Sequence, residues 1–489
     1  MRNLLALWLI IVSPAFLIPQ INSAPQSLVL THVTVIDMTG APPKPNMTVV
    51  IASNRITLLG RDTEVSAPPN ARVIDASGKF LIPGLWDMHA HTVYDRADDT
   101  ERTLLPLFVI NGVSGIRNLG SINSIEQINR WRAQVSDGRL IAPRIVIGQQ
   151  VDGFGGDKVS FVYRVRSAAE ARAAVERIKR EGFDFVKVYS RLSREEYFAA
   201  TDEAKRLGLP FAGHVPLAVG VGDASDAGQK SIEHLEGMLV TTSSDEARIR
   251  IEWMEYEQRV KALNGQPQPP ALEAQNFRLI AESLDTFNEE KAARLYSLFA
   301  RNGTYHCPTL VIHRAWGSLA HPALFTDARL RYVPVKQRSS VNSYLDAVRS
   351  WPAERKAIVE RLFQSRLRMV REMQRAGVEL LAGTDTAYGY PVGGFALHDE
   401  LSLFVQAGLT PMEALRTATY NPAKYLGLLD ALGTVEKGKV AHLVLLEANP
   451  LDDISNTQRI NAVIMNGRYL PKEELQRMLA NIEAAANRR

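Results

Sequence analysis

Two histidines stand one residue apart at the end of an apolar run. His89 and His91 follow the segment LIPGLW, which begins at Leu81. In a β-strand, residues i and i+2 project from the same face, so both imidazoles can reach one cation from a single strand. Neutral imidazole is the commonest metal ligand in proteins, and it binds zinc at about 2.0–2.1 Å. The pair alone also fits two polar residues in a turn, so a metal site requires further ligands.

Further candidate ligands stand at or near the ends of other apolar runs. Lys187 lies inside FDFVKVY, where an unpaired ammonium is costly to bury, while His214 ends PFAGH, His234 ends KSIEH and Asp385 follows ELLAGT. Taken singly, a strand-end histidine commonly has a structural role, and an Asp after Gly-Thr commonly caps a helix. Their joint occurrence favours one metal site. The single cysteine, Cys307, excludes an internal disulfide and a cage of several thiolates.

The segments around these residues alternate between strands and helices. In a barrel of parallel strands, the active site is built at the carboxyl ends of the strands, so the candidate ligands are expected to meet at one rim. The predicted fold class is α/β, with a (β/α)8 TIM barrel. Eight short apolar runs supply the expected strands, at residues 80–85, 112–119, 144–148, 183–189, 210–214, 230–234, 305–312 and 379–383.

The two ends of the 489-residue chain differ from its middle in sequence pattern. They contain short runs of β-branched residues separated by Gly, Pro and Asn. They predict a small β-sandwich built from both termini, over residues 25–79 and 431–472, beside a barrel domain over residues 80–430. Two connections, at about 240–302 and 319–376, are longer than a barrel needs and predict helical insertions. Such insertions commonly form a lid or wall over the active site, with a subunit contact as the alternative.

Residues 1–24 have the pattern of a secretory signal peptide. A positive start at Arg2 precedes an apolar core from Leu4 to Val12, and the segment ends in small residues at Ala24. The core is too short to span a bilayer, so we expect a secreted or periplasmic protein without a membrane segment after signal removal. The 57 basic and 53 acidic residues are interspersed, which gives no indication of a nucleic-acid surface. A homo-oligomer is left open.

Seven motifs together resemble the amidohydrolase superfamily, and most closely its imidazolonepropionase-like and Xaa-Pro-dipeptidase-like branch. They are LIPGLWDMHAH, FVKVY, FAGHVP, SIEHLEG, LLAGTDT, LTPMEALRTATYNPAKYLGL and GTVEKGKVAHLVLLEANPLDDI. The resemblance runs from about Ser27 to Arg468 and implies a TIM barrel with a flanking β-sandwich. It implies two divalent metal ions, with Lys187, carbamylated by CO2, bridging both. By the same resemblance, His89, His91 and Asp385 bind one ion, and His214 and His234 bind the other.

The activity that the resemblance implies is hydrolysis of an amide or peptide-like C–N bond by a metal-bridging hydroxide, with Asp385 as proton shuttle. Zinc is the expected metal, and cobalt, manganese or iron are compatible. The expected small-molecule substrate is a dipeptide or an N-acyl amino acid with an apolar or aromatic acyl group. Five residues are candidate substrate contacts, four because they lie close in sequence to the ligands and one at the seventh strand: Tyr94, Arg117, Tyr189, Tyr388 and His306.

Two departures from the branch leave the preferred leaving group open. The segment GFGGDKV has Asp157 where many relatives have a histidine, and Arg117-Asn118 replaces a common Arg-Asp pair. Three alternative functions remain. A lactonase or phosphotriesterase would share the binuclear centre, whereas a mononuclear deaminase would lack the bridging lysine. An exported binding protein that kept the fold without catalysis is disfavoured by the six intact ligands.

Overall fold

The computed structural model describes residues 27–92, 99–154, 161–263, 266–317, 327–338, 349–386 and 390–488. Several sequence predictions lie outside these ranges, namely the signal peptide at 1–24, Asp157, and the candidate substrate contacts Tyr94 and Tyr388.

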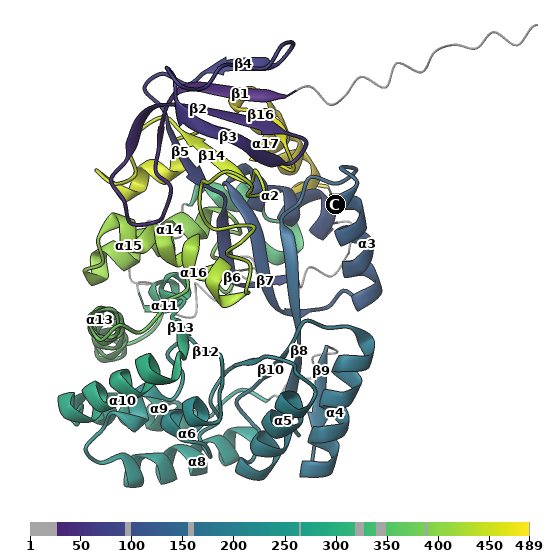
Figure 1. Ribbon diagram of the computed structural model, residues 1–489. Coiled ribbons are helices and arrows are strands. Elements are labelled where there is room, and N and C mark those ends of the chain that lie inside the picture. Colours follow the sequence, from purple (N-terminus) through teal and green to yellow (C-terminus); the bar gives the residue numbers. More distant parts are fainter. Residues whose placement is uncertain are drawn as a thin grey trace, which may run out of the picture.

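A curled parallel sheet occupies the centre of the molecule (Figure 1). Its strands follow the order β13-β12-β11-β10-β8-β7-β6, and β9 pairs with β8 at the side. Every residue of β6 and β7 is buried, as expected for strands that are covered on both faces. The strands are β6 (Leu85–Thr92), β7 (Val113–Ser121), β8 (Arg144–Gly153), β9 (Val162–Val165), β10 (Phe185–Val188), β11 (Phe211–Gly213), β12 (Ser231–Glu233) and β13 (Tyr305–Cys307).

Residues 379–386 connect the two edges of this sheet. Leu380 forms a parallel bridge with His306 of β13, and Thr386 forms a parallel bridge with Ala90 of β6. The segment therefore takes the place of an eighth strand and gives the sheet the closed form of a TIM-like barrel. Every candidate metal ligand belongs to one of these strands or to the residues directly after it.

Two predicted strands have different boundaries in the structure. The run at 80–85 was expected to be one barrel strand, but β5 (Phe80–Pro83) pairs with β1 and β14 in another sheet, and the barrel strand β6 begins after Gly84. Likewise, only Tyr305–Cys307 of the run at 305–312 is a strand, because helix α11 (Leu310–Gly317) begins at Leu310. Pro83 and Gly84, and Pro308 in the second run, interrupt regular pairing at these places.

Both ends of the chain contribute strands to a second sheet, shown in purple and yellow in Figure 1. Its order is β16-β15-β14-β5-β1-β2-β3, with β4 paired to β1. As expected, strands from both ends of the chain therefore pair in one sheet. The two layers of a sandwich stay a prediction. The strands are β1 (Leu28–Val35), β2 (Lys44–Ala52), β3 (Arg55–Arg61), β4 (Arg72–Asp75), β5, β14 (Leu443–Leu446), β15 (Ile460–Met465) and β16 (Arg468–Pro471).

The helices surround the barrel, and several begin at side-chain caps such as Ser167 before α4 and Ser193 before α5. The region at 240–302 is helical, and α8 and α9 of this region lie at one end of the barrel (Figure 1). None of the helices in the described ranges is long and apolar enough to cross a membrane. The α-helices are α2 (Leu105–Ile110), α3 (Ile125–Ser136), α4 (Ala168–Glu181), α5 (Arg194–Arg206), α6 (Val221–Asp226), α7 (Met238–Thr241), α8 (Glu246–Ala262), α9 (Pro270–Asp285), α10 (Glu289–Asn302), α11, α13 (Ala353–Arg375), α14 (Phe395–Ala407), α15 (Pro411–Thr417), α16 (Tyr420–Tyr425) and α17 (Lys472–Ala486).

Candidate metal centre

The two histidines of β6 are both buried, and each has one ring nitrogen held by the protein. Nδ1 of His89 lies 2.8 Å from Oε2 of Glu233, and Nδ1 of His91 lies 3.1 Å from the carbonyl oxygen of Gly120. Because these partners accept a proton from Nδ1, the Nε2 atoms carry the lone pairs. In the described residues, Nε2 of His89 is buried and makes no hydrogen bond. This pattern is typical of histidines that bind metals through Nε2.

The histidines that follow β11 and β12 are held in the same way. Nδ1 of His214 lies 2.7 Å from Oγ of Ser190, and Nδ1 of His234 lies 2.7 Å from Oγ1 of Thr309. Nε2 of His214 is buried and, among the described residues, has no hydrogen-bond partner. Four histidines from three parts of the barrel therefore have Nδ1 held by the protein, and two of them, His89 and His214, have an Nε2 atom without a hydrogen-bond partner among the described residues.

Unusual backbone conformations bring two of the candidate ligands into place. His234 has φ 60° and Asp385 has φ 54°, both in the left-handed region that residues with a side chain rarely occupy. At His234 the change of direction lets consecutive residues, Glu233 and His234, both contact His89. Backbone strain of this kind is characteristic of functional sites.

The side chains converge on a small volume. The ring centre of His89 lies 5.3 Å from that of His91 and 4.5 Å from that of His234, which in turn lies 4.9 Å from that of His214. Oδ1 of Asp385 lies 3.0 Å from Nε2 of His91 and 3.4 Å from Nε2 of His89. Ligand atoms of His89, His234 and Asp385 all lie within 4.8 Å of one another, close enough to hold one metal ion.

Lys187 lies at the same place, inside β10. Its side chain is buried, and burial lowers the pKa of its amine to about 8. The amine lies 5.0 Å from the ring centre of Tyr189, and that ring lies 4.1 Å from the ring of His214. A buried lysine with a lowered pKa has a substantial neutral fraction near neutral pH, which is the form that reacts with CO2.

The electrostatics of the centre favour neutral imidazoles and an ionised carboxylate. Burial lowers the pKa of His91 and of His214, and burial and then the ring of His89 lower the pKa of His234 to about 3. Burial alone would raise the pKa of Asp385, but the rings of His89 and His234 hold it well below its usual range. Neutral imidazole and carboxylate are the protonation states that bind metals.

Arg117 does not have the expected role of a substrate contact. It is fully buried beneath the centre, where its guanidinium lies 2.8 Å and 2.9 Å from the two carboxylate oxygens of Glu233 and bonds Ser231 and Tyr425. With its donors engaged inside the barrel, Arg117 positions Glu233, which in turn holds His89. Glu233 was not singled out from the sequence, although it directly precedes His234 in the motif SIEHLEG.

His306 also does not lie where a substrate contact was predicted from the sequence. Successive residues of a strand point to opposite faces, and in β13 it is Cys307 that lies among the inward-facing groups with His89 and Glu233. His306 is fully buried, with its ring 4.6 Å from that of Phe299 on α10, so it faces the helical layer. Burial lowers the pKa of His306 to about 3.

His313 of α11 is a neighbour of the centre that the sequence prediction missed. Its ring centre lies 6.0 Å from that of His234, and burial lowers its pKa well below the usual value. It directly follows the run at 305–312 that was predicted as a strand, outside every motif. No sequence signal marked it out.

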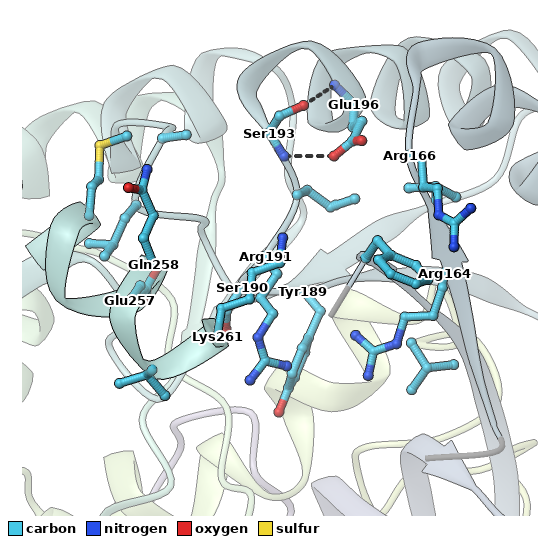
Figure 2. A pocket seen from close by; sticks show the side chains of 18 of the residues that line it. Arg164, Arg166, Tyr189, Ser190, Arg191, Ser193, Glu196, Glu257, Gln258 and Lys261 are labelled. Carbon is cyan, nitrogen blue, oxygen red and sulfur yellow. Dashed lines mark hydrogen bonds between the residues drawn. The ribbon is translucent and has the colours of Figure 1, made fainter. Parts of the chain in front are cut away.

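A cavity of about 780 Å³ adjoins the centre, and Figure 2 presents it from close by. Tyr189 and Ser190 line it directly beside His214, and Glu257, Gln258 and Lys261 of α8 line it as well. The volume is typical of pockets for small molecules. Residues of α8, in the first predicted insertion, and Tyr189 therefore line the same cavity, and their contact with a substrate stays a prediction.

Comparison with known proteins agrees with this geometry. The sequence profile of the amidohydrolase family matches residues 80–470. The chain belongs to the amidohydrolase family. The residues that could hold a metal ion, among them His89, His234 and Asp385, all lie within the matched part of the chain.

Individual members of the amidohydrolase family resemble the chain over most of its length. The imidazolonepropionase of Vibrio vulnificus is 24% identical over 459 residues, which cover 89% of this chain and 95% of that protein. Among solved structures, a bottromycin amidohydrolase has a TM-score of 0.73 at 22% identity, with 95% of this chain and 92% of that chain covered. A Xaa-Pro dipeptidase with bound methionine has a TM-score of 0.63 at 20% identity, with 91% and 100% covered.

The ochratoxinase of Aspergillus niger matches over a shorter stretch. It is 38% identical over 109 residues, which is 22% of this chain and 22% of that protein. The match spans about a fifth of the length of that relative. It therefore does not show which reaction this amidohydrolase catalyses.

Proposed function

We propose that this amidohydrolase is an exported enzyme with two divalent metal ions that hydrolyses the C–N bond of a dipeptide or an N-acyl amino acid. The observation that carries the proposal is the shared arrangement of four histidines, in which Nδ1 is held by the protein. The Nε2 atoms of His89 and His214 lie buried without a hydrogen-bond partner in the described part of the chain.

The donor set fits two cations of the zinc type. His89, His91 and Asp385 would hold one ion and His214 and His234 the other, with carbamylated Lys187 between them. Carbamylation replaces a buried ammonium by two anionic oxygens, which removes the cost of burying the charge and supplies a bridging ligand. When bound, the two ions polarise the substrate carbonyl and lower the pKa of water enough to provide a nucleophile near neutral pH.

The residues of the chain supply orientation and proton transfer. Asp385 is an ionised carboxylate on the Nε2 side of His89 and His91, so its oxygen can take the proton of the attacking water and deliver it to the leaving amine. Glu233, Ser190 and Thr309 fix the orientation of three imidazoles through their Nδ1 atoms. The cavity beside His214 holds the substrate next to the centre.

A peptide-like substrate is favoured over the alternatives by two considerations. The solved neighbours include a Xaa-Pro dipeptidase with bound methionine, a protein whose name describes cleavage of a dipeptide. Lys187 lies inside the centre, where a mononuclear deaminase would not need it. A lactonase or phosphotriesterase would use the same ligands, so these activities belong in the same screen.

The test is a substrate screen with metal-loaded protein, using dipeptides, N-acyl amino acids, lactones, aryl phosphotriesters and adenine. We expect hydrolysis of one of the first two classes, and Asp385→Asn should lower the rate at least 10²-fold while most of the metal stays bound. The control is Asp226→Asn, which removes a carboxylate at the end of α6. Turnover confined to lactones or phosphotriesters, ammonia release from adenine, or an Asp385→Asn enzyme with full activity would contradict the proposal.

Export rests on residues 1–24 alone and has a separate test. After expression with its own N-terminus, the mature protein should be recovered outside the cytoplasm, with cleavage after Ala24 and a new N-terminus at Pro25. An intact Met1 on the protein from every compartment would contradict this part of the proposal.

A further inference from the structure

The cavity beside the metal centre has walls of two kinds. One kind is apolar, and two of its members, Phe154 and Met254, expose 51% and 37% of their surface, which is unusual for side chains of this size. The other kind is cationic, because Arg164, Arg166, Arg191 and Lys261 line the cavity together with two acidic residues, Glu196 and Glu257.

Most of these charges have partners within the protein. Arg164 donates a hydrogen bond to Oδ2 of Asp152 at 2.6 Å, and the guanidinium of Arg166 lies 3.7 Å from the ring centre of Phe154. Glu196 caps its own helix, accepting a hydrogen bond from the backbone N–H of Ser193 at 2.8 Å. The carboxylate partner of Arg164 and the helix cap formed by Glu196 leave little of these two charges available to a bound molecule.

Arg191 is different. Its backbone N–H binds Oδ1 of Asp152 at 2.8 Å, which fixes the loop, whereas its guanidinium lies 3.8 Å from Oδ2 of the same carboxylate, beyond hydrogen-bond distance. Arg164 already occupies that oxygen. In Figure 2 the Arg191 side chain extends from the loop that also carries Tyr189, two residues earlier. Arg191 is thus a partly exposed cation next to the residue that contacts His214.

The acidic side chain across the cavity does not cancel this charge. Burial, and next the charge of Glu236, raise the pKa of Glu257 to about 7, so it is only partly ionised at neutral pH. A planar guanidinium beside apolar walls is suited to a carboxylate on an apolar or aromatic group, since arginine binds carboxylates through two parallel hydrogen bonds.

We infer that this cavity binds the amino-acid part of the substrate that is released as the leaving group, with Arg191 pairing its carboxylate and Phe154 and Met254 contacting a large apolar side chain. The inference rests on the proposed function, because a dipeptide or N-acyl amino acid carries its carboxylate on the amine side of the cleaved bond. It adds a preference to the proposed function: a free carboxylate next to a large apolar side chain.

The test measures binding of reaction products, which are not turned over. L-phenylalanine and L-phenylalaninamide differ only in the carboxylate, so their dissociation constants are measured by calorimetry on the metal-loaded protein. Wild type should bind the acid at least tenfold more tightly than the amide, which is about 1.4 kcal/mol. Arg191→Gln should bring this ratio close to one, and Arg191→Lys should keep part of it.

Two controls separate this effect from general damage. Arg177→Gln, on the exposed face of α4, should leave the ratio unchanged, and circular dichroism should be the same for all the variants. Met254→Ser should weaken binding of phenylalanine about threefold to tenfold and leave binding of glycine unchanged, because only the larger side chain reaches the apolar wall.

Equal affinities of wild type for the acid and the amide, or a ratio that survives Arg191→Gln, would overturn the inference. This outcome is distinguishable from failure of the proposed function. A protein that binds phenylalanine in the expected pattern but cleaves no C–N bond would contradict the proposed function only. Cleavage of dipeptides without discrimination between acid and amide products would overturn the subsite only.

Discussion

Nδ1 of His89 donates a hydrogen bond to Oε2 of Glu233 across 2.8 Å in the fully buried interior of the barrel. The carboxylate is held in turn by Arg117, and both charged side chains are nearly inaccessible to solvent. Burial alone would raise the pKa of Glu233, but the charge of Arg117 and the hydrogen bond from His89 hold it well below its usual range. The orientation of a metal ligand therefore depends on an ion pair that lies beneath it.

Arg117→Met should destabilise the protein strongly, because it leaves the Glu233 carboxylate buried without its cation. We expect a loss of about 3–5 kcal/mol in the free energy of unfolding, measured by urea denaturation of the metal-free protein. The double variant Arg117→Met/Glu233→Met should lose less than the sum of the two single variants. If the losses in the free energy of unfolding of the two single variants simply add in the double variant, Arg117 and Glu233 do not stabilise one another.

Thr309→Val should weaken one metal position and leave the fold intact. The substitution keeps the shape of the side chain but removes the oxygen that holds Nδ1 of His234. Loss of such a partner typically lowers metal affinity about 10-fold to 100-fold. The affinity is measured by competition with a chelator, with Thr57→Val in β3 as the control. Unchanged affinity in Thr309→Val would show that the hydrogen bond does not orient a ligand.

Carbamylation of Lys187 should depend on pH in a defined direction. Burial lowers the pKa of the amine to about 8, and only the neutral amine reacts with CO2. At fixed dissolved CO2, the rate of carbamate formation in metal-free protein should rise about tenfold from pH 6 to pH 7 and level off above pH 8. The measurement is the carbamate signal in 13C NMR after addition of labelled bicarbonate.

The matched variants are Lys187→Ala, which should lose this NMR signal, and Lys179→Ala on α4, which should keep it. A signal that persists in Lys187→Ala, or a rate that does not change with pH, would contradict carbamylation at this position.

Glu400 should make stability fall as the pH rises. Its two carboxylate oxygens accept the backbone N–H groups of Leu310 and Val311, at 2.9 Å and 2.6 Å, at the start of α11. Burial nevertheless raises its pKa from 4.5 to about 8, so the folded protein holds a proton that the unfolded chain releases. The stability that Glu400 contributes is therefore complete below pH 4.5 and is lost as the pH rises to about 8.

The measurement is the free energy of unfolding at several pH values, relative to Glu400→Gln, which does not titrate. The difference should decline with a slope of at most about 1.4 kcal/mol per pH unit between pH 4.5 and 8. The exposed Glu176→Gln should have no such slope relative to wild type. A difference that grows with pH would reverse the sign and contradict the protonated state of Glu400.

The sequence was sufficient where a local pattern determines geometry. The i, i+2 spacing of His89 and His91 places both rings on one face of β6, and Lys187 inside an apolar strand marked a buried amine. The expected alternation of strands and helices is present, with α4 before β10 and α5 after it. The six candidate ligands therefore lie at the end of the barrel where the carboxyl ends of the parallel strands come together.

Other features depend on contacts between segments that are distant in the sequence, so no local sequence pattern predicts them. Arg117 was expected at the substrate, but its partner Glu233 is 116 residues away in sequence. His306 was expected in the pocket, although the alternation along β13 turns it outward and Cys307 inward. The role proposed for Arg191 depends on Asp152, which lies near two arginines. Arg164 donates a hydrogen bond to Oδ2 of Asp152, whereas the guanidinium of Arg191 lies 3.8 Å from the same oxygen.

The central claim is that four imidazoles, Asp385 and modified Lys187 surround two metal ions. Anomalous X-ray diffraction from crystals of the zinc-loaded protein, collected above and below the zinc edge, tests it directly. We expect two zinc peaks per chain, one beside Nε2 of His89 and His91 and the other beside Nε2 of His214 and His234, with density for a carbamate on Lys187. A single peak with an unmodified lysine, or zinc bound only elsewhere on the protein, would contradict it.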